Sequence, residues 1–373
     1  MAPTAKSRTA SKPDSLREAG SALTAWYAGR ARDLPWRRNV SPYRVLVSEI
    51  MLQQTRTETV ASRFEQFMER FPDPETLASA PEDEVLKLWE GLGYYSRARN
   101  LHKAAKVIAE QFGGQMPADH QQLLSLPGVG EYTAAAVETI AFGRPAVALD
   151  ANAVRIALRL EGAELEAVSK AGRALARSRL EAMLTLDQPD VFTQAVMELG
   201  QTVCRPRRAE CSVCPLRPWC AGQADPLRYP AARQEKAKPV TVLTVAALFT
   251  PDMAALRRRP DGGLLAGLYE PLNWAGELTQ ADLLGRLEGL GIEVNDAVRL
   301  RPWRHEFTHR VWQLTGWRIA VREPKRLQDI VWADRDMLGQ RCAVPTAFRP
   351  AIAEWECTPW KTLWSRDPFS GIT

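Results

Sequence analysis

Long apolar runs are absent from this 373-residue sequence, since no hydrophobic stretch approaches the roughly 18 residues that a membrane-spanning helix needs. The basic start, Met1–Arg8, is not followed by the apolar core of a secretory signal. The sequence also lacks internal repeats and low-complexity segments, and its hydrophobic (45%) and charged (25%) fractions are those of ordinary globular proteins. We therefore expect an intracellular protein with no membrane partner.

Cysteine and histidine are both scarce, with six and four residues, but the cysteines are not scattered. Four of them form one compact cluster without histidine: Cys204, Cys211, Cys214 and Cys220. In a reducing compartment this pattern indicates a metal site, and four thiolates suit either a structural zinc ion or a four-iron cluster. The spacing does not choose between them, although a first gap of six residues is unusual for a zinc ribbon. The loop Arg205–Arg208, which ligands would pin at both ends, carries three arginines and predicts a phosphate-contacting element.

The net charge of +5 is modest, but its distribution is uneven. Residues 1–40 and residues 201–240 each hold eight lysines or arginines against three acidic residues. Two basic stretches suit a surface that contacts phosphates, and solvated surface charge is an equally good explanation.

A change of pattern along the chain predicts two domains. From about residue 15 to residue 200, apolar residues recur at helical spacings of three and four, and no convincing strand interrupts them. Residues 241–250 and 311–321 are rich in β-branched or aromatic residues and predict strands, with a helix at 279–290 between them. We expect a disordered basic tail (1–14), an all-α domain (15–221) with the cysteine cluster (204–220), a linker (222–239) and a smaller α+β domain (240–373).

A glycine-containing turn lies between two helical patterns, at Leu126–Gly130. The backbone N–H groups of Gly128, Val129 and Gly130 could grip a phosphate, because no bulky side chain stands in the way. Taken alone, an ordinary connection between helices explains the turn more simply.

Asp150 follows twenty residues later, where a short apolar run gives way to a helix. Its simplest explanation is a helix N-cap, for which aspartate is a preferred residue. A carboxylate held by helix N–H groups is expected to have a depressed pKa, and its charge would suit a cationic centre.

Together, the Leu-Pro-Gly-Val-Gly turn, the aspartate and the cysteine cluster resemble the helix-hairpin-helix DNA glycosylases. The resemblance implies two helical subdomains with a DNA-facing cleft between them. It also implies that the four clustered cysteines bind a [4Fe-4S] cluster.

Two positions distinguish members of this superfamily. Relatives of the endonuclease III type carry a lysine after the Gly-Glu pair of the hairpin, whose amine forms a Schiff base and cleaves the strand, whereas this sequence has Tyr132. Glu49 lies on the apolar face of a predicted helix, which favours a raised pKa, although a surface glutamate explains the pattern equally well. Its segment and the motifs Leu34–Arg37 and Glu90–Arg97 resemble the MutY-type adenine glycosylases.

The resemblance implies a division of labour between the two carboxyl groups. Glu49 would be the general acid that protonates adenine, and Asp150 would stabilise the oxocarbenium ion or trap it as a nucleophile. Tyr132 and Asn152 would support them as hydrogen-bonding groups. Further residues assigned by resemblance are Trp36, Arg37 and Gln194 in the base pocket, Gln54 and Tyr94 as duplex wedges, and Arg97 as a DNA contact, although an aromatic residue at such positions is otherwise most often core.

The second domain resembles the Nudix-related domain with which MutY-type enzymes read 8-oxoguanine. Residues 263–271 match its signature moderately, but the region 285–291 has a single glutamate, so no magnesium-dependent hydrolysis is expected. Thr308 and His309 match the lesion-reading motif, with threonine in place of the usual serine. A strand-end histidine without a ligand is the alternative for His309.

The resemblance thus implies a monofunctional adenine glycosylase, cytoplasmic and nucleoid-associated, that binds double-stranded DNA containing adenine opposite 8-oxoguanine or guanine. We expect it to act as a monomer. Ala151 departs from the family's usual glycine and would interfere if that position needs a positive φ. Two rivals remain: a glycosylase for oxidised pyrimidines or mismatched thymine, and a DNA-binding protein without catalysis.

Overall fold

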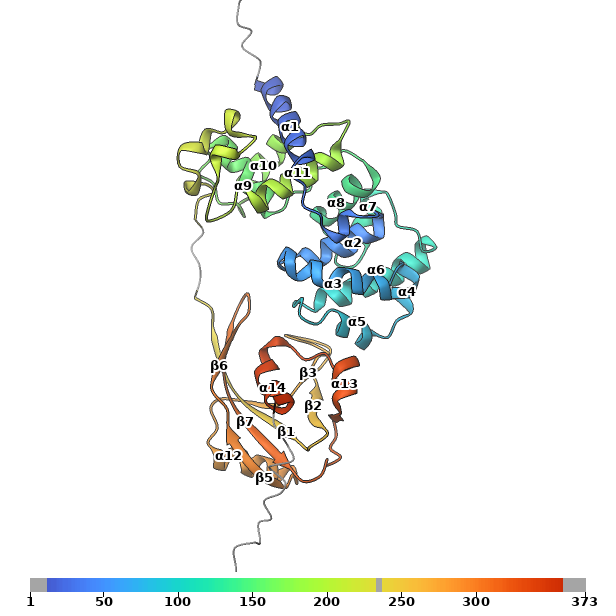
Figure 1. Ribbon diagram of the computed structural model, residues 1–373, viewed down its shortest axis with the longest axis vertical. Coiled ribbons are helices and arrows are strands. Elements are labelled where there is room, and N and C mark those ends of the chain that lie inside the picture. Colours follow the sequence, from blue (N-terminus) through green and yellow to red (C-terminus); the bar gives the residue numbers. More distant parts are fainter. Residues whose placement is uncertain (1–11, 233–236, 358–373) are drawn as a thin grey trace, which may run out of the picture. The chain divides into compact units, whose positions relative to one another are not determined.

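The computed structural model describes residues 12–232 and 237–357, which form two compact units (Figure 1). The first, here the helical unit, comprises Met1–Ser79 and Asn100–Glu235; the second, here the sheet unit, comprises Ala80–Arg99 and Lys236–Thr373. None of the helices in the described part of the chain combines the length and the apolar character that crossing a bilayer requires.

Short helices make up the helical unit, and its described residues contain no β-strand beyond isolated bridges. Its elements are α1 (Lys12–Ala28), η1 (Pro35–Arg37), α2 (Pro42–Leu52), α3 (Thr57–Arg70), α4 (Pro74–Ser79), most of α6 (Ser96–Phe112), α7 (His120–Ser125), α8 (Glu131–Phe142), α9 (Ala151–Glu161), α10 (Lys170–Met183), α11 (Pro189–Thr202), η2 (Cys211–Val213), η3 (Arg217–Trp219), η4 (Ala221–Ala224) and η5 (Pro226–Arg228). The expectation of an all-α first part is confirmed.

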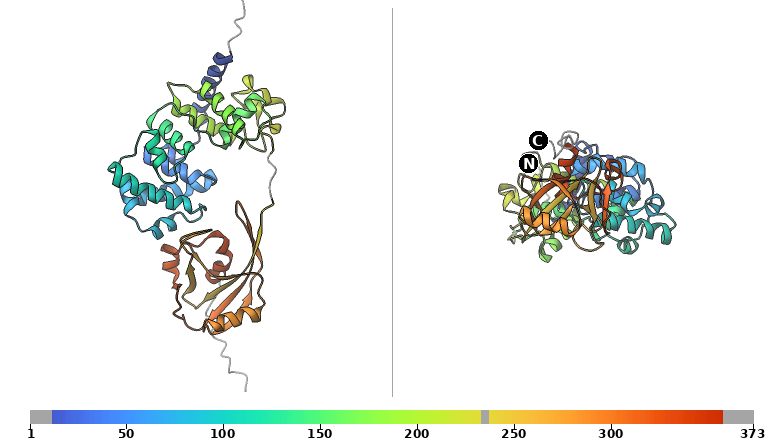
Figure 2. Two further views of the ribbon diagram at one scale, coloured as in Figure 1. Left: turned by 180° about the vertical axis from the view of Figure 1, so that it is seen from behind. Right: turned by 90° about the horizontal axis from the view of Figure 1, so that it is seen from below.

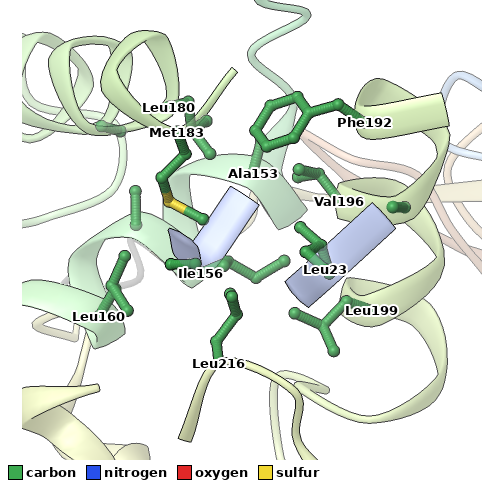
Figure 3. Close-up of a cluster of buried hydrophobic side chains, with 14 of the residues drawn as sticks. Leu23, Ala153, Ile156, Leu160, Leu180, Met183, Phe192, Val196, Leu199 and Leu216 are labelled. Carbon is green, nitrogen blue, oxygen red and sulfur yellow. The ribbon is translucent and has the colours of Figure 1, made fainter. Parts of the chain in front are cut away.

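One apolar core joins α1 to α9, α10 and α11 (Figure 3). Leu23 of α1, Ile156 of α9 and Phe192 of α11 are almost completely buried in it, and Leu216 from the cysteine loop packs against them. Burial of side chains of this size contributes about 1.5–3 kcal/mol each. This core therefore fixes α9 and α11 against α1 and α10.

The boundaries of the helical unit along the chain differ from those expected for the tail (1–14) and the linker (222–239). Helix α1 begins at Lys12, inside the expected 1–14 tail, and residues 1–11 lie outside the described part of the chain. The first residues of the expected 222–239 linker form η4 and η5, where Arg159 donates to the Tyr229 carbonyl. This stretch is anchored to α9 rather than extended away from it.

The sheet unit contains a mixed eight-stranded sheet with helices on both faces (Figures 1 and 2). Its elements are α5 (Glu82–Leu88), β1 (Val240–Phe249), β2 (Ala254–Arg258), β3 (Tyr269–Glu270), β4 (Leu272–Ala275), α12 (Gln280–Gly289), β5 (Val294–Arg299), β6 (Trp303–Glu306), β7 (Val311–Val321), β8 (Ile330–Ala333), α13 (Arg335–Gln340), η6 (Thr346–Phe348) and α14 (Arg349–Cys357). The α+β expectation is confirmed, and the three predicted elements appear as β1, α12 and β7.

Alternation along β1 explains the layers of this unit. Val245 and Ala247 face a core that α14 closes with Trp355, whereas Ala246 and Leu248 face a second core that α12 closes. The central pairing is parallel, between β1 and β7, with ten residue pairs in register. Both faces are thus buried, as a parallel pair requires.

A short segment of the first half of the chain, Ala80–Arg99, belongs to the sheet unit. Glu90 holds it there: this carboxylate accepts hydrogen bonds from Lys87 at 2.6 Å and from the Val344 amide at 3.3 Å, and it pairs with Arg349. The expected division of the chain, with a single linker at residues 222–239, did not place residues 80–99 in the second unit.

Candidate active site

A small cavity of the helical unit lies between η1, α2, α8 and α11. Its walls combine apolar side chains with a few polar ones, the composition typical of sites for flat organic ligands. The lining residues are Leu34, Trp36, Arg37, Val40, Val45, Ser48, Glu49, Leu52, Ile140, Gln194, Met197 and Gln201.

Glu49 is the acidic residue of this wall. It is 5% exposed on α2, and the Tyr132 hydroxyl donates a hydrogen bond to its Oε2 at 2.6 Å. Burial raises the pKa of Glu49 to about 7; the Tyr132 hydrogen bond opposes the rise and the charge of Asp150 adds to it. Glu49 is thus a carboxyl group that can carry a proton near neutral pH.

Asp150 is the N-cap of α9, as expected. Its Oδ1 accepts from the Ala153 amide at 2.6 Å, and its Oδ2 accepts from Asn152 Nδ2 at 2.7 Å. The expected depressed pKa is wrong: burial raises the pKa of Asp150 above its usual value, although both hydrogen bonds and the charge of Arg155 oppose the rise. Ala151 is the first residue of α9 and does not have a positive φ. Its backbone conformation therefore does not require the glycine that the family usually has here.

A chain of hydrogen bonds connects Asp150 through Asn152 and Arg155 to the cysteine loop. Arg155 donates to Asn152 Oδ1 at 2.9 Å, to the Gly200 carbonyl at 2.8 Å and to the Cys204 carbonyl at 3.0 Å. A Cβ on Gly200 would lie 2.5 Å from the Asn152 Cβ, so only glycine allows α11 to approach this closely. The role of Arg155 was missed because two of its three partners, Gly200 and Cys204, lie 45 and 49 residues away in the sequence.

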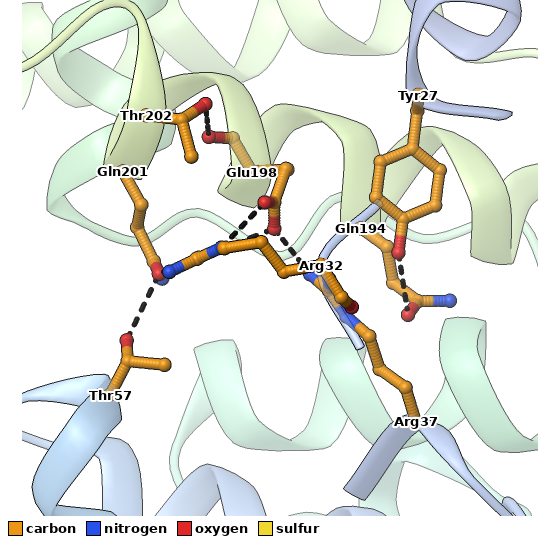
Figure 4. A network of polar contacts seen from close by, with 8 residues as sticks. All are labelled: Tyr27, Arg32, Arg37, Thr57, Gln194, Glu198, Gln201 and Thr202. Carbon is orange, nitrogen blue, oxygen red and sulfur yellow. Dashed lines mark hydrogen bonds and ion pairs between the residues drawn. The ribbon is translucent and has the colours of Figure 1, made fainter. Parts of the chain in front are cut away.

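The predicted base-pocket residues Trp36, Arg37 and Gln194 all line the cavity. Trp36 is 9% exposed and meets Phe64 edge to face, and Gln194 Oε1 accepts from the Tyr27 hydroxyl at 3.2 Å. Arg37 is held by Glu198, a fully buried carboxylate that sequence reasoning missed (Figure 4).

The hairpin residues Gly128, Val129 and Gly130 connect α7 to α8. Gly128 has φ of +82°, and a Cβ there would lie 2.7 Å from the Asn100 Cβ, so this position requires glycine. A Cβ on Gly130 would meet nothing within 4 Å. Packing within the protein therefore does not explain the glycine at position 130. Close approach of a bound ligand, such as a phosphate, to this backbone would explain it.

Two predicted wedge residues have left-handed backbones, which is rare for residues other than glycine. Gln54, exposed at the end of α2, has φ of +57°. Tyr94, in the sheet unit, has φ of +46° and is 44% exposed. Such strain is often stored at functional sites.

Arg97 is predicted to contact DNA, but its side chain is largely buried within its own loop. It is 8% exposed, donates to the Leu92 and Gly93 carbonyls at 2.9 and 3.0 Å, and lies over the rings of Trp89 and Tyr94. Burial lowers the pKa of its guanidinium to about 10. Arg97 therefore supports the loop beneath Tyr94 instead of presenting its charge on the surface.

Thr308 and His309 are exposed between β6 and β7 of the sheet unit. The Thr308 and Tyr94 hydroxyls are 2.6 Å apart and hydrogen-bonded. The ring of Phe307, the residue before Thr308, packs edge to face on Trp312, with 4.8 Å between the ring centroids.

The four clustered cysteines line one cavity beside Arg159. Arg159 Nη1 donates to the Cys204 sulfur at 3.3 Å, and burial raises the pKa values of Cys214 and Cys220 to about 12 and about 11. In the part of the chain that the structure describes, no group of three or more cysteine, histidine or acidic side chains is arranged around a single metal ion.

The donors at this cavity are four cysteine sulfurs from one short loop region. Four thiolates are the ligand set that a [4Fe-4S] cluster takes, so the residues present fit such a cluster.

Comparison with known proteins identifies the class. Residues 47–179 match the model of the HhH-GPD superfamily of base excision DNA repair proteins, and residues 244–354 match that of the NUDIX domain. A solved thermostable thymine-DNA glycosylase is 30% identical, with a TM-score of 0.52, over 57% of this chain and 97% of its own. The chain belongs to the HhH-GPD superfamily of base excision DNA repair proteins.

The curated relatives narrow the resemblance further. Human adenine DNA glycosylase is 41% identical over 207 residues, which are 53% of this chain and 38% of the human protein. That of Mycolicibacterium smegmatis is 42% identical over 52% of this chain and 66% of its own. The chain thus spans about two fifths of the human relative's length. Together with the NUDIX domain, these relatives confirm the resemblance to the MutY-type members.

Proposed function

We propose that this chain is a monofunctional adenine DNA glycosylase. Its substrate is double-stranded DNA in which adenine is paired with 8-oxoguanine or guanine, and its product is an abasic site. The observation that carries the proposal is Glu49, a buried carboxyl group that can carry a proton near neutral pH and that lies in the wall of a small, partly apolar pocket. The names of the curated relatives support the same reaction.

Proton transfer to the base is the first step. Because the Tyr132 hydroxyl donates to Oε2 of Glu49, the acidic proton is carried by Oε1. Glu49 gives this proton to a ring nitrogen of adenine that has been flipped into the pocket, and the neutral base leaves as the glycosidic bond breaks. Trp36, Arg37 and Gln194 hold the base in place.

Stabilisation of the sugar is the second step. Asp150 faces the developing oxocarbenium ion as a carboxylate, and the donors Ala153 and Asn152 support its charge. It either stabilises this cation until water adds to C1′, or forms a covalent bond to C1′ that water then opens. Since Tyr132 offers no amine for a Schiff base, the strand is left intact.

The cysteine cluster and the sheet unit serve DNA binding. Cys204, Cys211, Cys214 and Cys220 would hold a [4Fe-4S] cluster, which supplies no step of this reaction but fixes the loop 205–208 for phosphate contact. Gly128, Val129 and Gly130 offer backbone amides to another phosphate. Gln54 and Tyr94 wedge the duplex, and Thr308 and His309 read 8-oxoguanine.

Excision assays test the proposal. Duplexes with adenine opposite 8-oxoguanine, thymine glycol or a G·T pair are compared, because one solved relative is a thymine-DNA glycosylase. Release of adenine alone is the expected result, and release of thymine without adenine contradicts it. Glu49→Gln should keep DNA binding but lose several orders of magnitude of turnover. The matched control is Glu69→Gln, which changes an exposed glutamate of α3.

A further inference from the structure

An ion network centred on a buried carboxylate adjoins the base pocket, because Arg37 and Gln201 belong to both (Figure 4). Its centre is Glu198 of α11, whose side chain has no solvent exposure. Arg32 donates from Nε to Glu198 Oε1 at 2.6 Å, and Arg37 donates from Nη2 to Oε2 at 2.7 Å. A buried carboxylate is tolerated only when such partners satisfy it, so this pairing decides where both arginines lie.

The network is held from several elements. Arg32 Nη2 also donates to Gln201 at 2.5 Å, and Gln201 in turn accepts from Thr57 of α3 at 3.1 Å. Arg37 Nη1 donates to the Arg32 carbonyl at 3.0 Å. Burial alone would raise the pKa of Glu198, but the two arginines outweigh it and lower this pKa, so Glu198 is a stable anion.

Arg37 connects this anion to the acid of the pocket, because Arg37 and Glu49 line the same cavity. Three groups face Glu49: Tyr132 from α8, Asp150 from the start of α9, and Arg37 from η1. Of these, Arg37 brings the positive charge, and a positive charge favours the ionised form of Glu49. The groups that face Glu198 are Arg32 and Arg37, with the Tyr27 hydroxyl nearby.

We propose that Glu198 is a positioning residue whose buried carboxylate holds the Arg37 guanidinium in the pocket wall and counters its charge toward Glu49. This inference rests on the proposed role of Glu49 as the general acid. Arg37 can then contact a flipped base without ionising the acid that must protonate it. Glu198 itself touches no substrate, since it does not line the cavity.

The test is a pair of variants with opposite expected effects on Glu49. Glu198→Gln keeps the shape but removes the countercharge, so Glu49 should titrate lower by on the order of half a pH unit. The fall of kcat with rising pH should shift by the same amount, which is about a threefold loss at pH 8. Arg37→Met removes the positive charge and should shift the titration of Glu49 upward. The matched control is Glu161→Gln, which breaks an ion pair with Arg179 away from the pocket.

The titration of Glu49 is read by NMR on protein labelled with ¹³C-carboxyl glutamate, with Glu49→Gln identifying the signal. This readout needs no substrate. If the wild type releases no adenine but the two titrations shift as stated, the proposed function fails and the positioning role stands. If Glu198→Gln loses thermal stability alone, with the Glu49 titration unchanged, the positioning role is overturned. Should Glu198→Gln not fold, Arg37→Met decides, and a Glu49 titration that stays or moves down overturns the inference.

Discussion

The substitution Glu49→Gln should stabilise the protein while abolishing its chemistry. Burial raises the pKa of Glu49 from 4.5 to about 7 in the folded state. Between these values the unfolded carboxyl has lost its proton and the folded one retains it, so the free energy of unfolding falls as pH rises. The difference of about 2.5 pKa units corresponds to about 3 kcal/mol of lost stability above pH 7.

An amide has no such dependence on pH and can still accept the Tyr132 hydrogen bond. Urea unfolding of Glu49→Gln should therefore show a gain of about 3 kcal/mol at pH 8 but less than about 1 kcal/mol at pH 5. The exposed control Glu69→Gln should show no gain at either pH. An equal gain at both pH values, or a loss of stability at pH 8, would refute the raised pKa and with it the role of Glu49 as the general acid.

Three further substitutions probe the other parts of the proposal. Tyr132→Lys supplies an amine at the sugar and should produce strand cleavage and a borohydride-trapped complex, whereas Tyr132→Phe should produce neither. Cys211→Ser should remove the visible absorption near 400 nm that a four-iron cluster gives, while Cys342→Ser, outside the cysteine cavity, should retain it. Thr308→Ala loses a hydroxyl and should raise KM about tenfold for adenine opposite 8-oxoguanine but not opposite guanine. An equal effect on both pairs would remove Thr308 from lesion reading.

Local pattern and motif resemblance were sufficient to predict the helical framework and to single out Glu49, Tyr132 and Asp150 as candidate site residues. These three residues could be singled out because each lies in a short segment whose helix start or apolar face can be recognised in the sequence. In the structure, Glu49 and Tyr132 share a hydrogen bond and Asp150 caps a helix. The strands β1 and β7 were visible for the same reason.

Features that depend on the whole packing could not be predicted in this way. The pKa of Asp150 rises because the surrounding structure excludes water, and no local signal reports that burial. Glu198 and its partners Arg32 and Arg37 are more than 160 residues apart, so their pairing has no sequence spacing to reveal it. The placement of Ala80–Arg99 in the sheet unit likewise rests on distant contacts, such as that of Glu90 with Arg349.

The packing of α1 has a consequence for the folding of the protein during its synthesis on the ribosome. Leu23 is buried against Phe192 and Leu199, which are synthesised about 170 residues later. At 5–20 residues per second, the apolar face of α1 waits on the order of ten seconds or more for its partners. During that interval a chaperone that covers α1 would protect the nascent chain from aggregation, and the core that supports Asp150 closes only when α11 has emerged.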